Sequence, residues 1–272
     1  MNRRTYLELL LPEFFKCHFS LLERLDILDS TCKSLCFPLC IFPRLTFVQI
    51  NKVRGLESLS FSISEGNPTS FDALHVSRCP NLVSIELPAL NFSRFFISDC
   101  ENLKSLLHNA ACFQSLILGG CPELIFPVQG LPSNLTSLSI TNCEKFRSQM
   151  ELGLQGLTSL RRFSISSKCE DLELFPKECL LPSTLTSLEI SHLPNLRCLG
   201  SEGLQLITTL QKLKISYCPK LQSLTEEGLP TSLSFLTIEN CPLLKDRCKF
   251  GTGEEWYHIA HIPHILIDDQ LL

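Results

Sequence analysis

Three histidines near the C-terminus have a spacing that could hold a metal ion. His258, His261 and His264 follow one another at intervals of three residues, and zinc sites are built from a few such side chains that converge on one ion. Pro263 would break any long helix that carried all three. The isoleucines between the histidines favour packing, so we interpret this segment as a cap on the preceding structure and expect no metal site here.

Cysteine is the second residue type that could bind metal or form disulfides. Cys32, Cys36 and Cys40 are spaced four residues apart, and a larger set occupies one position of a repeated string. A zinc site needs several ligands around one ion, whereas one cysteine per repeat forms a line, so we expect these thiols to be buried, reduced and structural. We expect them to hydrogen-bond with backbone carbonyls of the neighbouring coil. The cysteines of this row are Cys79, Cys100, Cys121, Cys143, Cys218 and Cys241, with Cys169 displaced by one residue.

Motifs of catalysis are missing from the 272 residues. The sequence has no G-x-S-x-G, no H-E-x-x-H, no G-x-x-x-x-G-K-[ST] and no D-F-G. Its 24 Lys and Arg against 28 Asp and Glu give a net charge of -4, unlike the basic footprint of a nucleic-acid binder. No apolar run reaches the length of about 18 residues needed to span a bilayer. We therefore expect a protein without enzymatic activity, cofactor, nucleic-acid partner or membrane partner.

One string, L-x-x-L-x-I-x-x-C-x-x-L, recurs along the chain with conservative replacements. Successive copies begin 21 to 26 residues apart, which is the period of leucine-rich repeats. A single copy cannot bury its apolar edge, but stacked copies bury a continuous core. The copies begin at Leu22, Leu45, Phe71, Phe92, Phe113, Leu135, Leu160, Leu185, Leu210 and Leu233.

The alternation L-x-I predicts one short, half-buried strand in each copy. The segments between strands are short and rich in Pro and Ser, which indicates irregular or single-turn structure. The fold class that follows is an α/β-type solenoid, a leucine-rich-repeat horseshoe with a curved parallel β-sheet on its concave side and a mostly irregular convex side. We expect an N-terminal edge or partial repeat at 1–21, about ten repeats at 22–244, and a C-terminal cap at 245–272.

The residues between the buried positions of each strand should face solvent on the concave side. Unlike the framework they do not repeat, and a fixed scaffold with a variable face is typical of a binding module. We expect Phe96 and Ile117 to form an exposed apolar anchor. The central column of this face is Asp26, Gln49, His75, Phe96, Ile117, Ser139, Ser164, Glu189, Lys214 and Thr237.

Charges on the same face are unevenly distributed. A basic stretch near its C-terminal end comprises Arg161, Arg162, Lys212 and Lys214, opposite the acidic residues Glu23, Asp26 and Asp29. Since charges mainly govern encounter and discrimination, the basic stretch would steer an acidic partner. The candidate partner-binding residues are therefore Asp26, Gln49, His75, Phe96, Ile117, Arg161, Arg162, Glu189 and Lys214.

The degenerate repeats and the tail together resemble a known family. Asn240-Cys241-Pro242-Leu243-Leu244, then Gly253-Glu254-Glu255-Trp256 and Ala260-His261-Ile262-Pro263, are similar to the C-terminal region of plant intracellular nucleotide-binding leucine-rich-repeat disease-resistance proteins of the coiled-coil class. The resemblance covers essentially the whole chain. It implies a cytoplasmic immune sensor that recognises a pathogen effector, or a host protein altered by one.

The resemblance also has limits that the residues set. The phosphate-binding loop of that family is missing from this sequence, so the resemblance implies the sensor part alone, acting with a nucleotide-binding module in cis or in trans. No copy carries the L-x-G-x-I-P string of extracellular plant receptors, which favours the cytoplasm. The alternative is a substrate-recognition subunit or adaptor of a ubiquitin ligase, for which residues 1–21 are too short to supply an F-box-like segment.

Overall fold

A computed structural model describes residues 21–64, 69–108, 112–125, 131–145, 154–168, 172–177, 180–225, 227–268 and 270–271. The expected N-terminal edge, apart from its last residue, and Cys169 lie outside these ranges. The chain divides into two compact units. Unit 1 comprises residues 1–135 and 143–149, and unit 2 comprises residues 136–142 and 150–272.

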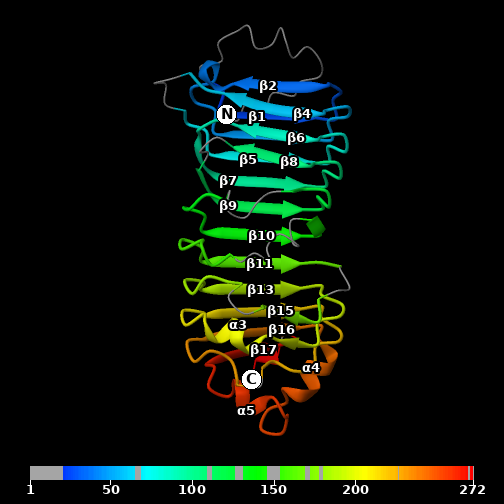
Figure 1. Ribbon diagram of the computed structural model, residues 1–272, viewed down its shortest axis with the longest axis vertical. Helices are drawn as coiled ribbons and strands as arrows, with labels where there is room; N and C mark the ends of the chain where they lie inside the picture. The colour runs from blue at the N-terminus through cyan, green and yellow to red at the C-terminus, as the bar shows by residue number, and fades with distance from the viewer. Residues whose placement is uncertain are drawn as a thin grey trace. The chain divides into compact units, whose positions relative to one another are not determined.

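Unit 1 is built around a main sheet of parallel strands, one from each repeat (Figure 1). The pairing keeps the repeats in register, with Leu25 opposite Val48 and Ile27 opposite Ile50. Because successive side chains of a strand point to opposite faces, the second and fourth residues of each five-residue strand enter the core. The strands are β1 (Arg24–Leu28), β3 (Phe47–Asn51), β5 (Ala73–Ser77), β7 (Asn91–Ser98) and β9 (Cys112–Gly119).

A second parallel sheet covers the other side of the core in unit 1, where mostly irregular structure was expected. Its strands alternate buried and outward residues, as Leu35 and Phe37 do in the first of them and Leu59 and Phe61 in the next. Phenylalanines from neighbouring repeats also stack inside, with Phe37 and Phe61 ring centroids 5.3 Å apart. The strands are β2 (Ser34–Pro38), β4 (Ser58–Ser62), β6 (Ser84–Leu87) and β8 (Ser105–His108), with the 3-10 helix η1 at Leu39–Ile41.

Unit 2 continues the same construction with a more irregular second side. Its main sheet holds β10 (Ser137–Thr141), β11 (Arg162–Ser166), β13 (Ser187–Ser191), β15 (Lys212–Ser216), β16 (Phe235–Glu239) and β17 (His264–Ile267), all parallel, and then β18 (Gln270–Leu271), which is antiparallel. Its second side has the two-stranded sheet β12 (Leu174–Phe175) and β14 (Cys198–Leu199), together with α3 (Ser201–Gln205).

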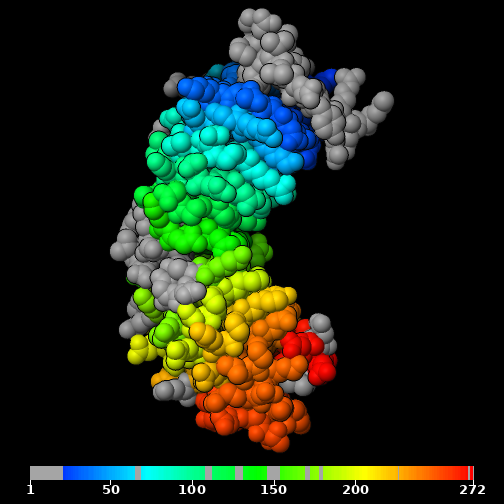
Figure 2. All heavy atoms as spheres, turned by 90° about the vertical axis from the view of Figure 1, so that its right-hand side faces the viewer, coloured from blue at the N-terminus to red at the C-terminus, as the bar shows by residue number. Residues whose placement is uncertain are grey.

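The segment expected as a cap at 245–272 also contributes a strand to the main sheet. Helix α4 (Pro242–Arg247) begins before residue 245, helix α5 (Trp256–Ile259) follows, and β17 then joins the main sheet beside β16. In Figure 2 the red C-terminal residues lie against the orange segment that precedes them. Hydrogen bonds between β16 and β17 therefore tie the end of the chain to the sheet.

The phase of the predicted strands is confirmed by burial. Ile140, Ile190 and Ile215 are all at most 1% exposed, as the alternation L-x-I requires. Each of the ten predicted repeats holds one strand of the main sheet. The parallel strands and the stacked repeats define the fold as a leucine-rich-repeat solenoid.

A residue in the left-handed backbone conformation directly follows nearly every strand of the main sheet. Asp29, Lys52, Arg78 and Asp99 have φ between 47° and 55°, a conformation that is uncommon outside glycine. The turn lets the next side chain point into the core, and the backbone N–H of Asp29 donates to the carbonyl of Asn51 in the next repeat at 3.1 Å. Corresponding residues with positive φ in unit 2 are Asn142, His192, Tyr217, Asn240 and Asp268.

Candidate functional site

In each unit, the first, third and fifth residues of the five-residue main-sheet strands, and the residues paired with them in β7, β9 and β17, form a surface that we call the open face. We name its columns by the position of their residues in the strand, as the first, third and fifth columns. The third column is the central column expected from the sequence, because the strands pair residue for residue. In unit 1 the register joins Asp26, Gln49, His75, Phe96 and Ile117. In unit 2 it joins Ser139, Ser164, Glu189, Lys214 and Thr237. The order of the column is thus confirmed, while the role of these residues in binding stays a prediction.

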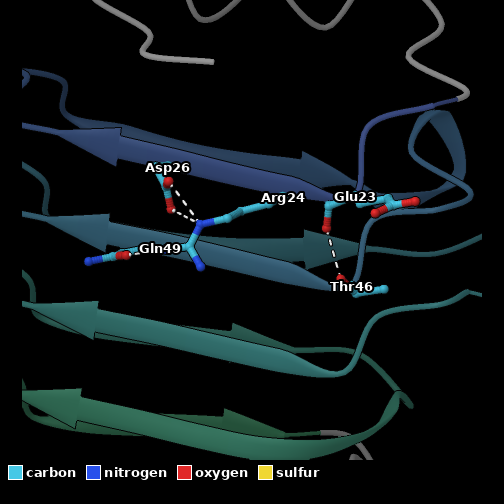
Figure 3. Close-up of polar contacts among 5 residues, drawn as sticks. All are labelled: Glu23, Arg24, Asp26, Thr46 and Gln49. Atoms are coloured by element: carbon cyan, nitrogen blue, oxygen red, sulfur yellow. Dashed lines mark hydrogen bonds and ion pairs between the residues drawn. The ribbon is translucent and has the colours of Figure 1, made fainter. Parts of the chain in front are cut away.

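The first two rungs of unit 1 form a closed polar network (Figure 3). The Arg24 guanidinium donates to both carboxylate oxygens of Asp26 at 2.9 and 3.0 Å and to the Gln49 side-chain oxygen at 2.8 Å. It also lies 4.1 Å from the centre of the Phe47 ring. Only 7% of the Asp26 side chain is exposed, so this candidate residue is covered by Arg24 and is already neutralised.

The next rungs of unit 1 are aromatic and apolar. The rings of His75 and Phe96 meet edge to face, with centroids 4.1 Å apart, and Ile117 on the following strand is 39% exposed. Burial, and then the positive charge of Arg24, lower the pKa of His75. The imidazole is therefore neutral near pH 7 and belongs to the same apolar area as Phe96 and Ile117.

The basic stretch expected in unit 2 is divided by contacts within the protein. Lys214 Nζ lies 2.9 Å from the Glu239 carboxylate, and this bond, with Glu189 nearby, raises the Lys214 pKa. The Arg161 guanidinium donates to the carbonyls of Thr158 and Leu160 at 3.0 and 3.2 Å. Both cations are therefore held by contacts within the protein. The cations that remain free on the open face lie in its first column.

That first column contains a site that the sequence analysis did not predict. The rings of Phe235 and His264 stack with centroids 4.6 Å apart, and Lys212 Nζ lies 5.3 Å from the centre of the Phe235 ring. The contact depends on β17 joining the sheet, whereas His264 was assigned to the cap. The alternation in His-Ile-Leu-Ile at 264–267 could have indicated that strand.

Another ring pair lies at the opposite edge of the face. His192 and Tyr217 each follow a strand with positive φ, and their rings stack with centroids 4.6 Å apart. Tyr217 is 49% exposed. These positions were missed because the residues that occupy the left-handed conformation share no type.

The histidines and cysteines with suggestive spacing lie in different surroundings. His264 is on the open face, while His261 Nε2 is 3.4 Å from the Pro230 carbonyl oxygen. Cys36 is exposed on β2, and Cys32 and Cys40 are half-buried. Among the described residues no group of three or more His, Cys, Asp or Glu side chains is placed to hold a metal ion.

The row of cysteines is buried, as predicted, but its contacts differ in detail. Cys79 and Cys121 each donate to the carbonyl two residues earlier in their own repeat, Sγ to oxygen 3.3 Å, rather than to one in the neighbouring coil. The neighbouring coil instead brings another thiol: Cys100 hydrogen-bonds with Cys121 and Cys79, and these bonds, then burial, raise its pKa. Since a thiol has one proton, each can give it either to a carbonyl or to the next sulfur.

Comparison with known proteins supports the class that the fold defines. No family model matches the chain. Over an alignment of 265 positions, which covers 93% of the chain, it is 35% identical to the "Putative disease resistance protein At3g14460" of Arabidopsis thaliana. The chain spans 18% of that relative's length. The resemblance to plant disease-resistance proteins is confirmed by this identity, and the chain is a leucine-rich-repeat solenoid similar to one part of such a protein.

A solved structure resembles the chain more weakly. The crystal structure of the TLR13–ssRNA13 complex matches 81% of this chain and 46% of its own, with 15% sequence identity and a TM-score of 0.32. Within the described residues no helix is long and apolar enough to cross a membrane.

Proposed function

We propose that this chain is a non-catalytic protein-recognition module of a plant immune receptor, which senses a pathogen effector or a host protein altered by one. The observation that carries the proposal is the contrast between framework and open face. Leu74, Phe95 and Leu116 fill one buried position in successive strands, whereas His75, Phe96 and Ile117 beside them differ in chemistry. A surface that varies on a constant frame suits selective binding of a protein.

The compartment and the signalling partner are parts of the same proposal. We place the module in the cytoplasm, where its twelve described cysteines, all free thiols, remain reduced. A nucleotide-binding module in cis or in trans would convert recognition into a signal. The 35% identity to one part of a disease resistance protein supports this arrangement.

Within unit 1 the binding energy should come from the apolar rungs. Asp26 is neutralised by Arg24, so it has little free charge to offer a partner. Phe96 and the 39% exposed Ile117 can bury their side chains without breaking an ion pair, and aromatic and apolar anchors supply most of the energy of an interface. We expect Phe96→Ala to weaken binding by about 1 to 3 kcal/mol, or roughly 5- to 150-fold in Kd.

The test is direct binding of the purified chain to a panel of purified pathogen effectors, measured by biolayer interferometry. Leu107→Ser on β8 is the matched control, since Leu107 is 56% exposed on the second sheet. For any effector that binds, Phe96→Ala and Ile117→Ser should raise Kd and Leu107→Ser should not. Loss of binding with Leu107→Ser alone would assign recognition to the other side of the solenoid and contradict the proposal.

A further inference from the structure

The first column of the open face in unit 2 carries free positive charge. Arg162 and Lys212 are both exposed, and neither forms an ion pair with any residue that the structure describes. The acidic residues Glu189 and Glu239 instead act on Lys214 in the central column. The cations of the first column are therefore available to an anion from outside the protein.

The spacing within the column fits a narrow ligand. Arg162 and Lys212 are separated by Ser187 on the strand between them, so two rungs of about 4.8 Å each place their backbones about 10 Å apart. Serine is small and leaves both long side chains uncovered. An extended polypeptide that crosses these rungs can bring one carboxylate to each cation.

An apolar platform adjoins the second cation. Phe235 follows Lys212 in the column, is 44% exposed and is held between the Lys212 ammonium at 5.3 Å and the His264 ring at 4.6 Å. Contacts on both sides fix the ring before a ligand arrives, which reduces the entropy lost on binding. An aromatic or aliphatic side chain of the ligand can pack against the exposed edge of this ring.

We propose that Arg162, Lys212, Phe235 and His264 form a docking site for an extended acidic protein segment that also carries apolar side chains. The site rests on the proposed function, because it uses the same open face for recognition. A wide polyanion such as nucleic acid is disfavoured, since Lys214 and Lys245 are already paired with Glu239 and Asp268 and leave, among the described residues, no free cation beside the first column for a second row of phosphates. A single polypeptide segment can follow the first column and needs no further cation.

The probe is a fluorescein-labelled peptide of alternating Glu and Phe, twelve residues long, titrated with the full chain and followed by fluorescence anisotropy. Wild-type protein should bind it, and should bind a peptide with Gln in place of Glu far more weakly. The double variant Arg162→Gln/Lys212→Gln should lose about tenfold or more in affinity, with a smaller loss at high salt. Phe235→Ala should weaken binding at all salt concentrations.

The control variant removes the same charge elsewhere in unit 2. Arg197 pairs with Glu173 beside the two-stranded sheet, and Lys220 bonds to Asn195, so Arg197→Gln/Lys220→Gln should leave peptide binding unchanged. Equal loss in both double variants would show a general charge effect and overturn the proposal. So would absence of peptide binding, or binding of a twelve-nucleotide poly(dT) at least as tight as that of the peptide.

The two proposals can fail separately. If effector binding depends on Phe96 but the acidic peptide does not bind, the recognition function stands and the docking site falls. If the peptide binds through Arg162 and Lys212 but no effector binds the open face, the docking site stands and the immune function loses its support.

Discussion

A buried carboxylate joins the C-terminal segment to the repeats, and its removal provides a sharp test of the packing. The Glu255 side chain is 5% exposed; it accepts a hydrogen bond from the backbone N–H of Leu224 at 3.2 Å and lies 3.5 Å from the Arg247 guanidinium. Glu254 contacts the same guanidinium at 2.7 Å but is 74% exposed. The two glutamates thus share one cation and differ in burial.

The expected cost of Glu255→Ala follows from what it leaves behind. A buried N–H without an acceptor costs about 1 to 3 kcal/mol. The ion pair adds less than about 1 kcal/mol, because Arg247 is 38% exposed and keeps Glu254, and relief of the carboxylate's desolvation offsets part of the loss. We therefore expect a net loss of about 2 kcal/mol for Glu255→Ala and about 0 to 0.5 kcal/mol for Glu254→Ala.

Urea unfolding of both variants, with midpoints compared at equal slope, measures the difference. Hydrogen exchange of the Leu224 amide adds a local readout, because this N–H loses its acceptor only in Glu255→Ala. Equal midpoints for the two variants, or unchanged exchange at Leu224 in Glu255→Ala, would refute the assignment of Glu255 as the buried link.

Two further predictions concern the cysteine row and the central column. Cys121→Ser should cost about 1 to 2 kcal/mol in urea unfolding, since a buried hydroxyl needs a better hydrogen bond than a thiol does; in the native protein, mass spectrometry should find exposed Cys36 alkylated by iodoacetamide well before Cys121. Because burial and Arg24 hold the pKa of His75 below the 6.5 of the unfolded chain, the unfolded state takes up this proton first, so stability should fall as pH drops below about 6.5. His75→Gln should reduce that fall between pH 7.5 and 5.5, and an identical pH dependence in both proteins would contradict it.

The main sheet could be predicted from the sequence because burial alone dictates its pattern. Leu188 and Ile190, for example, point inward from β13 and contact the equivalent residues of neighbouring strands. Any polar replacement there would be buried without a partner. The framework therefore repeats in the sequence, and its period and phase can be read directly.

The second sheet of unit 1 could not be predicted in the same way. A segment such as Ser58–Ser62, with sequence Ser-Leu-Ser-Phe-Ser, has the alternation of a half-buried strand, but this pattern is not carried through all the repeats, as the two-residue strands β12 and β14 of unit 2 show. It becomes a strand because β2 and β6 run beside it in register. Pairing between repeats, and not local preference, decides its structure.

The residues that make up the open face could be predicted, but not which of its charged side chains form ion pairs. The register of Lys214 followed from the repeat, yet its partner Glu239 lies one strand further and in another column. The reach of a lysine side chain exceeds one rung, so several acidic residues were equally eligible. The hydrogen bond between Arg24 and Asp26 in unit 1 could likewise not be predicted from the sequence.

The distinction between engaged and free side chains decides which residues can recognise a partner. A charge that is neutralised in the free protein, as in Asp26 or Lys214, must give up an existing contact before it forms a new one, so its net contribution to binding is small. It instead holds neighbouring rungs in a fixed arrangement. Arg162 and Phe235 have no such contact to lose, since the serines beside Arg162 leave it uncovered and Phe235 keeps its contacts with Lys212 and His264 when a ligand packs against its exposed edge. Selectivity should therefore follow the unsatisfied positions of the open face, whatever the charge of the column as a whole.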